Sequence, residues 1–108
     1  MRALVTQARS ARATNNPQQV EASLERALRI EPRNPFLWQM LASAHLAQNE
    51  FDQAESTAQK SNSLARGNPY VEVENWKVIA AVRQSQGDAA AALQAQTRVD
   101  ALNHLLGQ

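Results

Sequence analysis

The chain has 108 residues, a length typical of one domain, and its 44% hydrophobic and 19% charged residues exclude a disordered or fibrous protein. Its 11 basic and 10 acidic residues nearly cancel, so no general field attracts nucleic acid or an anionic membrane surface. Because cysteine is absent, disulfides and thiolate metal sites are excluded as well.

The choice of residues favours helices. Alanine, glutamine, leucine and arginine dominate, whereas aromatic residues make up only 5%. The dominant side chains lose little conformational freedom in a helix. No stretch approaches the roughly 20 apolar residues of a membrane-spanning helix. The first residues, MRALVTQARSARA, lack the apolar core of a secretory signal. We therefore expect an all-α protein without membrane insertion.

The dipeptide Asn-Pro occurs three times, beginning at Asn16, Asn34 and Asn68. An asparagine side chain accepts a hydrogen bond from the first turn of a helix. Proline fits the next position, where its missing N–H costs nothing. Each Asn-Pro therefore predicts a helix start, and the interval from Asn34 to Asn68 has the length of a common helical repeat.

Further breaks at Asn49-Glu50 and Gly87-Asp88 separate runs with helical apolar periodicity. Short connections between helices force neighbours to be antiparallel, so the helices pair as hairpins. The sequence predicts six helices, over residues 2–14, 17–30, 35–48, 51–65, 69–86 and 89–106.

The chain also repeats itself. Aligning Trp38 with Trp76 matches apolar, small and turn residues with residues of the same kind: Leu41 with Ile79, Ala42 with Ala80, Asn49 with Gly87, and Ala54 with Ala92. A shift equal to the interval between the second and third Asn-Pro pairs places Leu4 under Trp38 and Ala8 under Ala42. A fixed period of this length is typical of helical repeat proteins.

The Trp-x2-Leu/Ile-Ala pattern at Trp38 and Trp76, with Ala54 and Ala92 in the following helices, resembles the tetratricopeptide repeat. The resemblance implies a right-handed superhelical solenoid of three antiparallel helix hairpins. The whole chain, 1–108, would be a single domain with repeats over about 1–34, 35–72 and 73–108. Other solenoids built from helix hairpins remain an alternative.

Several residues depart from the family pattern. His45 and Arg83 stand where the family has Tyr, and Ser61 replaces a small Ala. The middle repeat is also four residues too long. We interpret the excess as one extra turn containing Tyr70 at the start of a helix. A loop insertion over 66–72 is the rival interpretation.

Few groups suit catalysis. His45 and His104 lie far apart, so we interpret His45 as a packing residue and His104 as solvated. No metal-binding motif, phosphate-binding glycine loop or nucleophile motif is present. We therefore predict that the chain is not an enzyme and binds no metal or cofactor.

The resemblance implies instead that the first helix of each hairpin lines a concave groove that binds a partner. Arginine there can hold a carboxylate with two hydrogen bonds. The partner is predicted to be a protein or peptide with an acidic group, and not nucleic acid. Trp38 and Trp76 are assigned to the core. The candidate contact residues are Arg2, Arg9, Arg12, Phe36, Gln39, Ser43, Tyr70, Lys77 and Gln84.

The last helix suggests an alternative function. Val99, Leu102 and Leu106 form an apolar stripe, and Leu105 lies beside it. Apolar residues left at the end of a solenoid favour self-association or docking to another domain. Similar arrays, rich in Ala and Gln with Arg preferred over Lys, occur in bacterial cell-envelope proteins. If a leader has been removed, this suggests the periplasm or cell envelope, and otherwise the cytoplasm.

Overall fold

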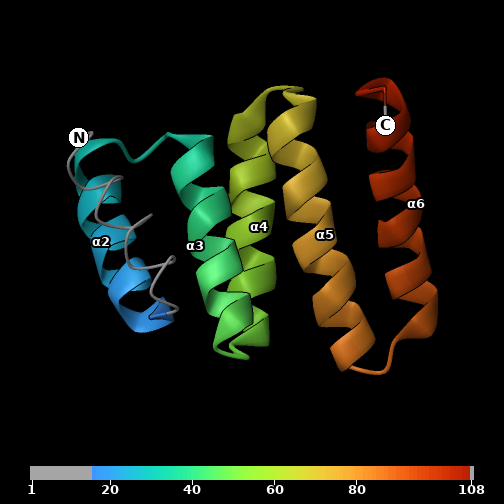
Figure 1. The fold of residues 1–108 in the computed structure, drawn as a ribbon, viewed down its shortest axis with the longest axis horizontal. Coiled ribbons are helices and arrows are strands. Elements are labelled where there is room, and N and C mark those ends of the chain that lie inside the picture. Colours follow the sequence, from blue (N-terminus) through green and yellow to red (C-terminus); the bar gives the residue numbers. More distant parts are fainter. Residues whose placement is uncertain (1–15, 108) are drawn as a thin grey trace.

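The computed structural model describes residues 16–107. Five helices follow one another in this part of the chain (Figure 1): α2 (Pro17–Ile30), α3 (Pro35–Ala47), α4 (Phe51–Ala65), α5 (Pro69–Ser85) and α6 (Ala89–Leu105). Each bound lies within one residue of its prediction. The helix predicted over residues 2–14 falls outside the described residues.

The three Asn-Pro pairs begin helices as predicted, with proline in the first turn. The Asn16 side chain accepts from the Gln19 amide at 3.2 Å. Asn68 accepts from the Tyr70 amide at 3.0 Å. Asn34 accepts from two amides, those of Phe36 and Leu37, at 3.0 and 3.4 Å. These bonds satisfy amide groups that have no partner within the helix.

The double cap at Asn34 predicts a measurable loss of stability when it is removed. Asn34→Ala should lower the free energy of unfolding by about 1 kcal/mol, the usual effect of losing an N-cap. Urea denaturation followed by circular dichroism measures it. Arg33→Ala, at an exposed neighbouring position, is the control and should change stability by less than about 0.5 kcal/mol. Equal losses in the two variants would contradict a capping role.

The extra four residues of the middle repeat are helical. Both α3 and α5 begin at an Asn-Pro pair, but α3 has 13 residues and α5 has 17. The added turn contains Tyr70, as the first interpretation held, and the loop alternative is wrong. Because four residues are close to one helical turn, Ile79 stays on the buried side, like Leu41 one repeat earlier.

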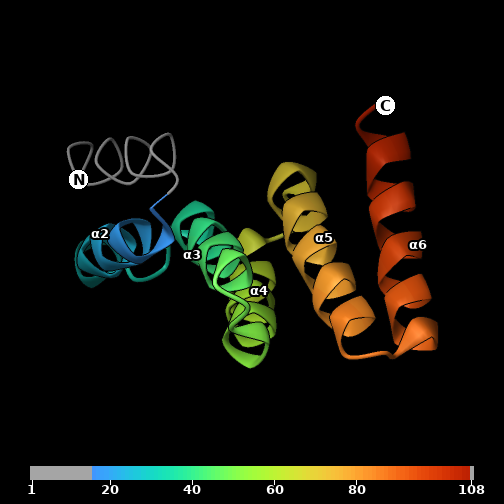
Figure 2. The same ribbon diagram turned by 60° about the horizontal axis from the view of Figure 1, so that its bottom comes forward.

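The helices lie side by side in chain order, and the two views agree on this (Figures 1 and 2). The described part measures 38 × 27 × 22 Å, with the long axis across the row. Each helix packs against the next along the chain. Consecutive helices run in opposite directions, so the described part consists of α2 followed by the hairpins α3–α4 and α5–α6.

The core is divided along the row into two clusters. The first joins α2 to α3 through residues that include Leu24 and Leu37. The second joins α3 and α4 to α5 and α6 through small residues, among them Ala54 and Ala58, packed against Ile79. Each repeat therefore buries its apolar face against the next one, as expected of a solenoid. The predicted all-α solenoid of helix hairpins is confirmed.

Candidate functional site

The described part of the row has an inner and an outer side. Helix α3 contacts α5, whereas α2 does not contact α4 and α4 does not contact α6. The first helices of the two complete hairpins are therefore closer together than the second helices. The row bends toward α3 and α5, which line its inner side. This is the side that the sequence analysis assigned to partner binding.

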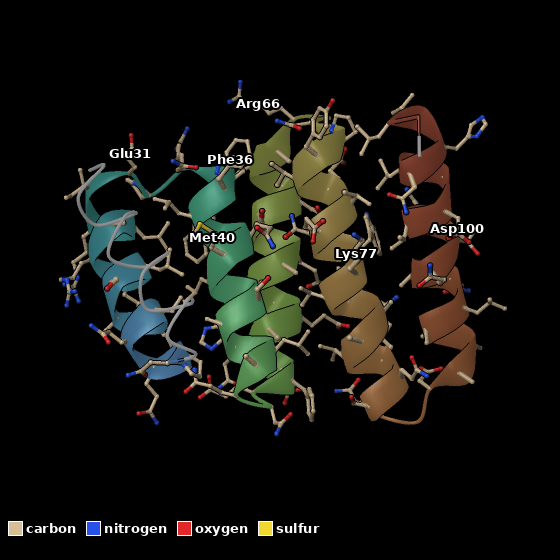
Figure 3. The ribbon with its side chains drawn as sticks, in the orientation of Figure 1. Glu31, Phe36, Met40, Arg66, Lys77 and Asp100 are labelled. Carbon is tan, nitrogen blue, oxygen red and sulfur yellow. The ribbon has the colours of Figure 1, made fainter. Side chains whose placement is uncertain are left out.

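On α3, two of the predicted contact residues bond to each other. The Gln39 amide donates to the Ser43 hydroxyl at 3.0 Å. Ser43 also lines a hollow of about 170 Å³ with Val20 of α2 and with Met40 and Ala44 of α3. Figure 3 shows Met40 on the side of α3 that faces α2. The polar pair therefore borders a small, partly apolar hollow.

On α5, the predicted basic group is already paired. Lys77 Nζ lies 3.2 Å from Glu74 Oε1, and both side chains are about half exposed. An acidic partner would have to compete with Glu74 for this ammonium group. Gln84 lines a different hollow of about 290 Å³, together with Leu93 of α6. Ser43 and Gln84 are thus lining residues of separate hollows.

Exposed apolar side chains lie along one edge of the row, where helices begin and end. Phe36 and Tyr70 occupy the second positions of α3 and α5 and are 53% and 66% exposed. Ile30 and Leu105, also exposed, end α2 and α6. Since neighbouring helices are antiparallel, these starts and ends lie at the same edge, along which Figure 3 also shows Glu31 and Arg66. We call these four residues the apolar edge.

The remaining candidates, Arg2, Arg9 and Arg12, lie outside the described residues. Their place beside the inner face stays a prediction. Of the predicted contact residues, the structure places Phe36 and Tyr70 at one edge and pairs Gln39 with Ser43. Among the described candidates, Ser43 and Gln84 line different hollows.

Both tryptophans pack against the core but keep one side accessible. Trp38 borders the first cluster and Trp76 the second. Lys60 Nζ lies 5.9 Å from the Trp38 ring centre and the Arg98 guanidinium 5.3 Å from that of Trp76. Each cation follows its tryptophan by the same interval along the chain, so the cation–π contact recurs with the repeat. The sequence analysis assigned both rings to the core but did not predict the cations that lie over them.

The departures at His45 and Arg83 have a shared explanation. Arg83 Nε donates to Glu55 Oε1 at 3.2 Å, which joins α5 to α4. His45 Nδ1 lies 3.8 Å from Glu21 Oε2, which joins α3 to α2. Each pair links the first helix of a repeat to the second helix of the preceding one, and Glu21 and Glu55 are one repeat length apart. Where the family has Tyr, this chain therefore has a polar residue that contacts a glutamate of the preceding repeat.

The Arg83–Glu55 pair is partly buried and predicts a moderate effect on stability. Arg83→Met keeps the apolar stem and removes the charge, and should cost about 1 kcal/mol of unfolding free energy. Lys77→Met removes an exposed pair and should cost at most about 0.5 kcal/mol. Urea titrations of both variants, with Glu55→Gln to close a double-mutant cycle, measure the coupling. No coupling between positions 55 and 83 would contradict the inter-repeat contact.

Few residues of the last helix, α6, are buried. In α6 the buried residues are Ala95 and Val99, whereas Leu102 and Leu106 are half-buried. Leu93 and Leu105 are exposed by more than two thirds. The inward stripe predicted from Val99, Leu102 and Leu106 is therefore fully buried only at Val99. This leaves a partly apolar outer surface at the end of the row.

The comparisons with known proteins agree with this architecture. The family model for the tetratricopeptide repeat matches residues 11–72, more than half of the 108 residues. The chain belongs to the tetratricopeptide-repeat family, whose helix hairpins form protein-interaction modules.

A solved structure narrows the likeness further. The chain is similar to the globular C-terminal domain of P. aeruginosa LpoP, with 38% sequence identity and a TM-score of 0.85. The alignment covers 91% of this chain and 92% of that one. No curated protein sequence matches the chain. Among the described helices, none is long and apolar enough to cross a membrane.

Proposed function

We propose that this module binds a segment of a partner protein along the inner face of α3 and α5, with the apolar edge as its anchor. The observation that carries the proposal is the pair of exposed aromatic side chains, Phe36 and Tyr70, at equivalent helix starts. Aromatic residues are enriched among those that dominate binding energy at protein interfaces. We propose no catalytic role, and the prediction that the chain is not an enzyme stays a prediction.

The polar groups next to the anchor would orient the bound segment. Gln39 and Ser43 offer amide and hydroxyl groups from α3, and Gln84 offers an amide from α5. Lys77 is held by Glu74, so it adds little net positive charge. A preference for acidic partners therefore depends on Arg2, Arg9 and Arg12. The variant Arg9→Glu/Lys77→Glu should lose an acidic partner but keep a neutral one.

Photo-crosslinking in cells tests the proposal. A photoreactive phenylalanine analogue is placed at position 36, 70 or 93, because Phe36, Tyr70 and Leu93 are all exposed. We expect positions 36 and 70 to capture the same discrete partner and position 93 to capture none. The double variant Phe36→Ala/Tyr70→Ala should lose that partner in a pull-down, whereas Leu93→Ala keeps it. Capture at position 93 alone, or no difference between the variants, would overturn the proposal.

A second candidate is self-association through α6. The exposed Leu93 and Leu105 and the half-buried Leu102 and Leu106 favour it. If it holds, sedimentation equilibrium should show a mass that rises with concentration. Leu93→Glu/Leu105→Glu should then restore a monomer, because charges do not bury without cost. A wild-type monomer at all concentrations would exclude this candidate.

We also infer a bacterial cell-envelope location. The support is the composition, rich in Ala and Gln with Arg preferred over Lys, together with the P. aeruginosa relative. Fractionation of bacterial cells that express the full gene product tests it. Recovery in the cytoplasmic fraction alone would contradict the inference.

A further inference from the structure

The side chains of Glu21, His45 and Glu50 converge at the junction of three segments. Glu21 belongs to α2, His45 to the last turn of α3, and Glu50 precedes α4. His45 Nδ1 lies 2.8 Å from Glu50 Oε1 and 3.8 Å from Glu21 Oε2. One donor atom from each residue lies within 4.8 Å of the other two. Around a tetrahedral zinc ion, donor atoms are roughly 3.3 Å apart.

Next to these donors is an acidic hollow of about 230 Å³. Its lining includes three carboxylates, those of Glu21, Glu25 and Glu50, with the amides of Gln18 and Gln48. No lysine or arginine is among the residues that line it. The hollow therefore favours a cation and provides the path of entry that a metal site needs.

The Glu50 side chain contacts His45 and does not cap the helix that it precedes. It is the N-cap residue of α4, yet its side chain makes no cap hydrogen bond. By contrast, the Asp88 side chain, at the equivalent position before α6, accepts from the Ala91 amide at 3.0 Å. The Glu50 carboxylate instead contacts His45, which is only 9% exposed.

Gln48 spans the two carboxylates. Its side-chain amide donates to Glu21 and, at 3.4 Å, to Glu50. This amide satisfies the acidic groups while no ion is bound. When turned about its last bond, the same group would offer a carbonyl oxygen as a fourth ligand.

We propose that Glu21, His45 and Glu50 form a binding site for a divalent transition metal ion of the zinc class. An imidazole with carboxylates suits zinc, whereas calcium and magnesium prefer oxygen ligands alone. The bound ion joins α2 to α3 and to the start of α4. It therefore locks one repeat to the next at the place where Arg83 and Glu55 do so one repeat later.

Zinc itself is the probe, added to the full chain after removal of any histidine tag. Isothermal titration calorimetry should give one zinc ion per chain. The Tm should rise by about 5 °C or more at a hundredfold excess over Kd, and a chelator should reverse the rise. Calcium and magnesium at equal concentration should leave the Tm unchanged.

Three variants locate the site. His45→Ala should weaken zinc binding by at least about tenfold. Because His45 is buried, Glu50→Gln provides a second ligand variant with little change in volume, and each variant is compared with and without zinc. His104→Ala, which removes the other histidine of the chain, is the control and should keep the full rise in Tm. If zinc leaves the wild-type Tm unchanged, or if His45→Ala and Glu50→Gln respond as the wild type does, the cluster is a hydrogen-bonded network only and the proposal fails.

Discussion

Leu37→Ala is expected to lower the free energy of unfolding by about 2–5 kcal/mol, the range for large-to-small changes in a packed core. Leu37 is 1% exposed and lies in the cluster that joins α2 to α3. Truncation leaves a cavity at the junction between two repeats, and a solenoid depends on such junctions. Urea denaturation monitored by circular dichroism measures the loss.

Leu93→Ala is the matched control for this change. Leu93 is 68% exposed on α6, so its truncation should alter stability by less than about 0.5 kcal/mol. A loss below about 1 kcal/mol for Leu37→Ala would mean that the junction between α2 and α3 contributes little to folding. The same variant is also the control in the partner pull-down, so one protein serves both the stability and the binding experiment.

Ser61→Ala is expected to cost about 1–3 kcal/mol, because it leaves buried polar groups without partners. The Ser61 hydroxyl donates to the Pro35 carbonyl and accepts from Asn75 Nδ2, each at 2.7 Å. Asn75 also donates to Asn62 Oδ1 at 2.9 Å. The network joins the start of α3 and the interior of α5 to α4. It explains why a serine replaces the small alanine of the family pattern.

Ser63→Ala provides the control on the same helix. The Ser63 hydroxyl donates to the Lys60 carbonyl and is exposed, so its removal should change stability by less than about 0.5 kcal/mol. A cycle with Asn75→Ala should give a coupling of about 0.5–3 kcal/mol with Ser61→Ala. Additive losses would show that Ser61 and Asn75 act independently.

Asn75 also leaves one acceptor unused. Among the buried side-chain atoms of residues 16–107, Asn75 Oδ1 has no hydrogen-bond partner. An unpaired buried acceptor costs free energy. Replacing Asn75 and Ser61 together by apolar residues should therefore cost less than the two single losses combined.

Most of the fold could be predicted because its signals are local. The Asn-Pro pairs begin helices through bonds to amides two or three residues away. The aligned turn residues Asn49 and Gly87 both adopt positive φ, 59° and 76°. The extra turn of α5 also followed from spacing, since whole turns preserve the facing of a helix. Such features depend on neighbours in the chain.

The candidate site was predicted less completely, since its groups meet across helices. Phe36 and Tyr70 were named from their place in the repeat, and the structure shows both exposed. The pairing of Lys77 with Glu74 and the contact of Arg83 with Glu55 were missed. The spacing of Glu21 and Glu55 by one repeat length was a signal in the sequence, but it had meaning only once the partners of His45 and Arg83 were known.

By itself, the sequence determined the helices, their order and the repeat, because capping, helix propensity and apolar periodicity act over a few residues. The tertiary structure decided which side chains meet, Glu21 with His45 and Glu50, and Ser61 with Asn75. It also decided that the four residues of the apolar edge stay exposed. Those meetings depend on how the helices pack and how the row bends. The angle and distance between packed helices set where each side chain lies, and a local sequence pattern does not determine either of them.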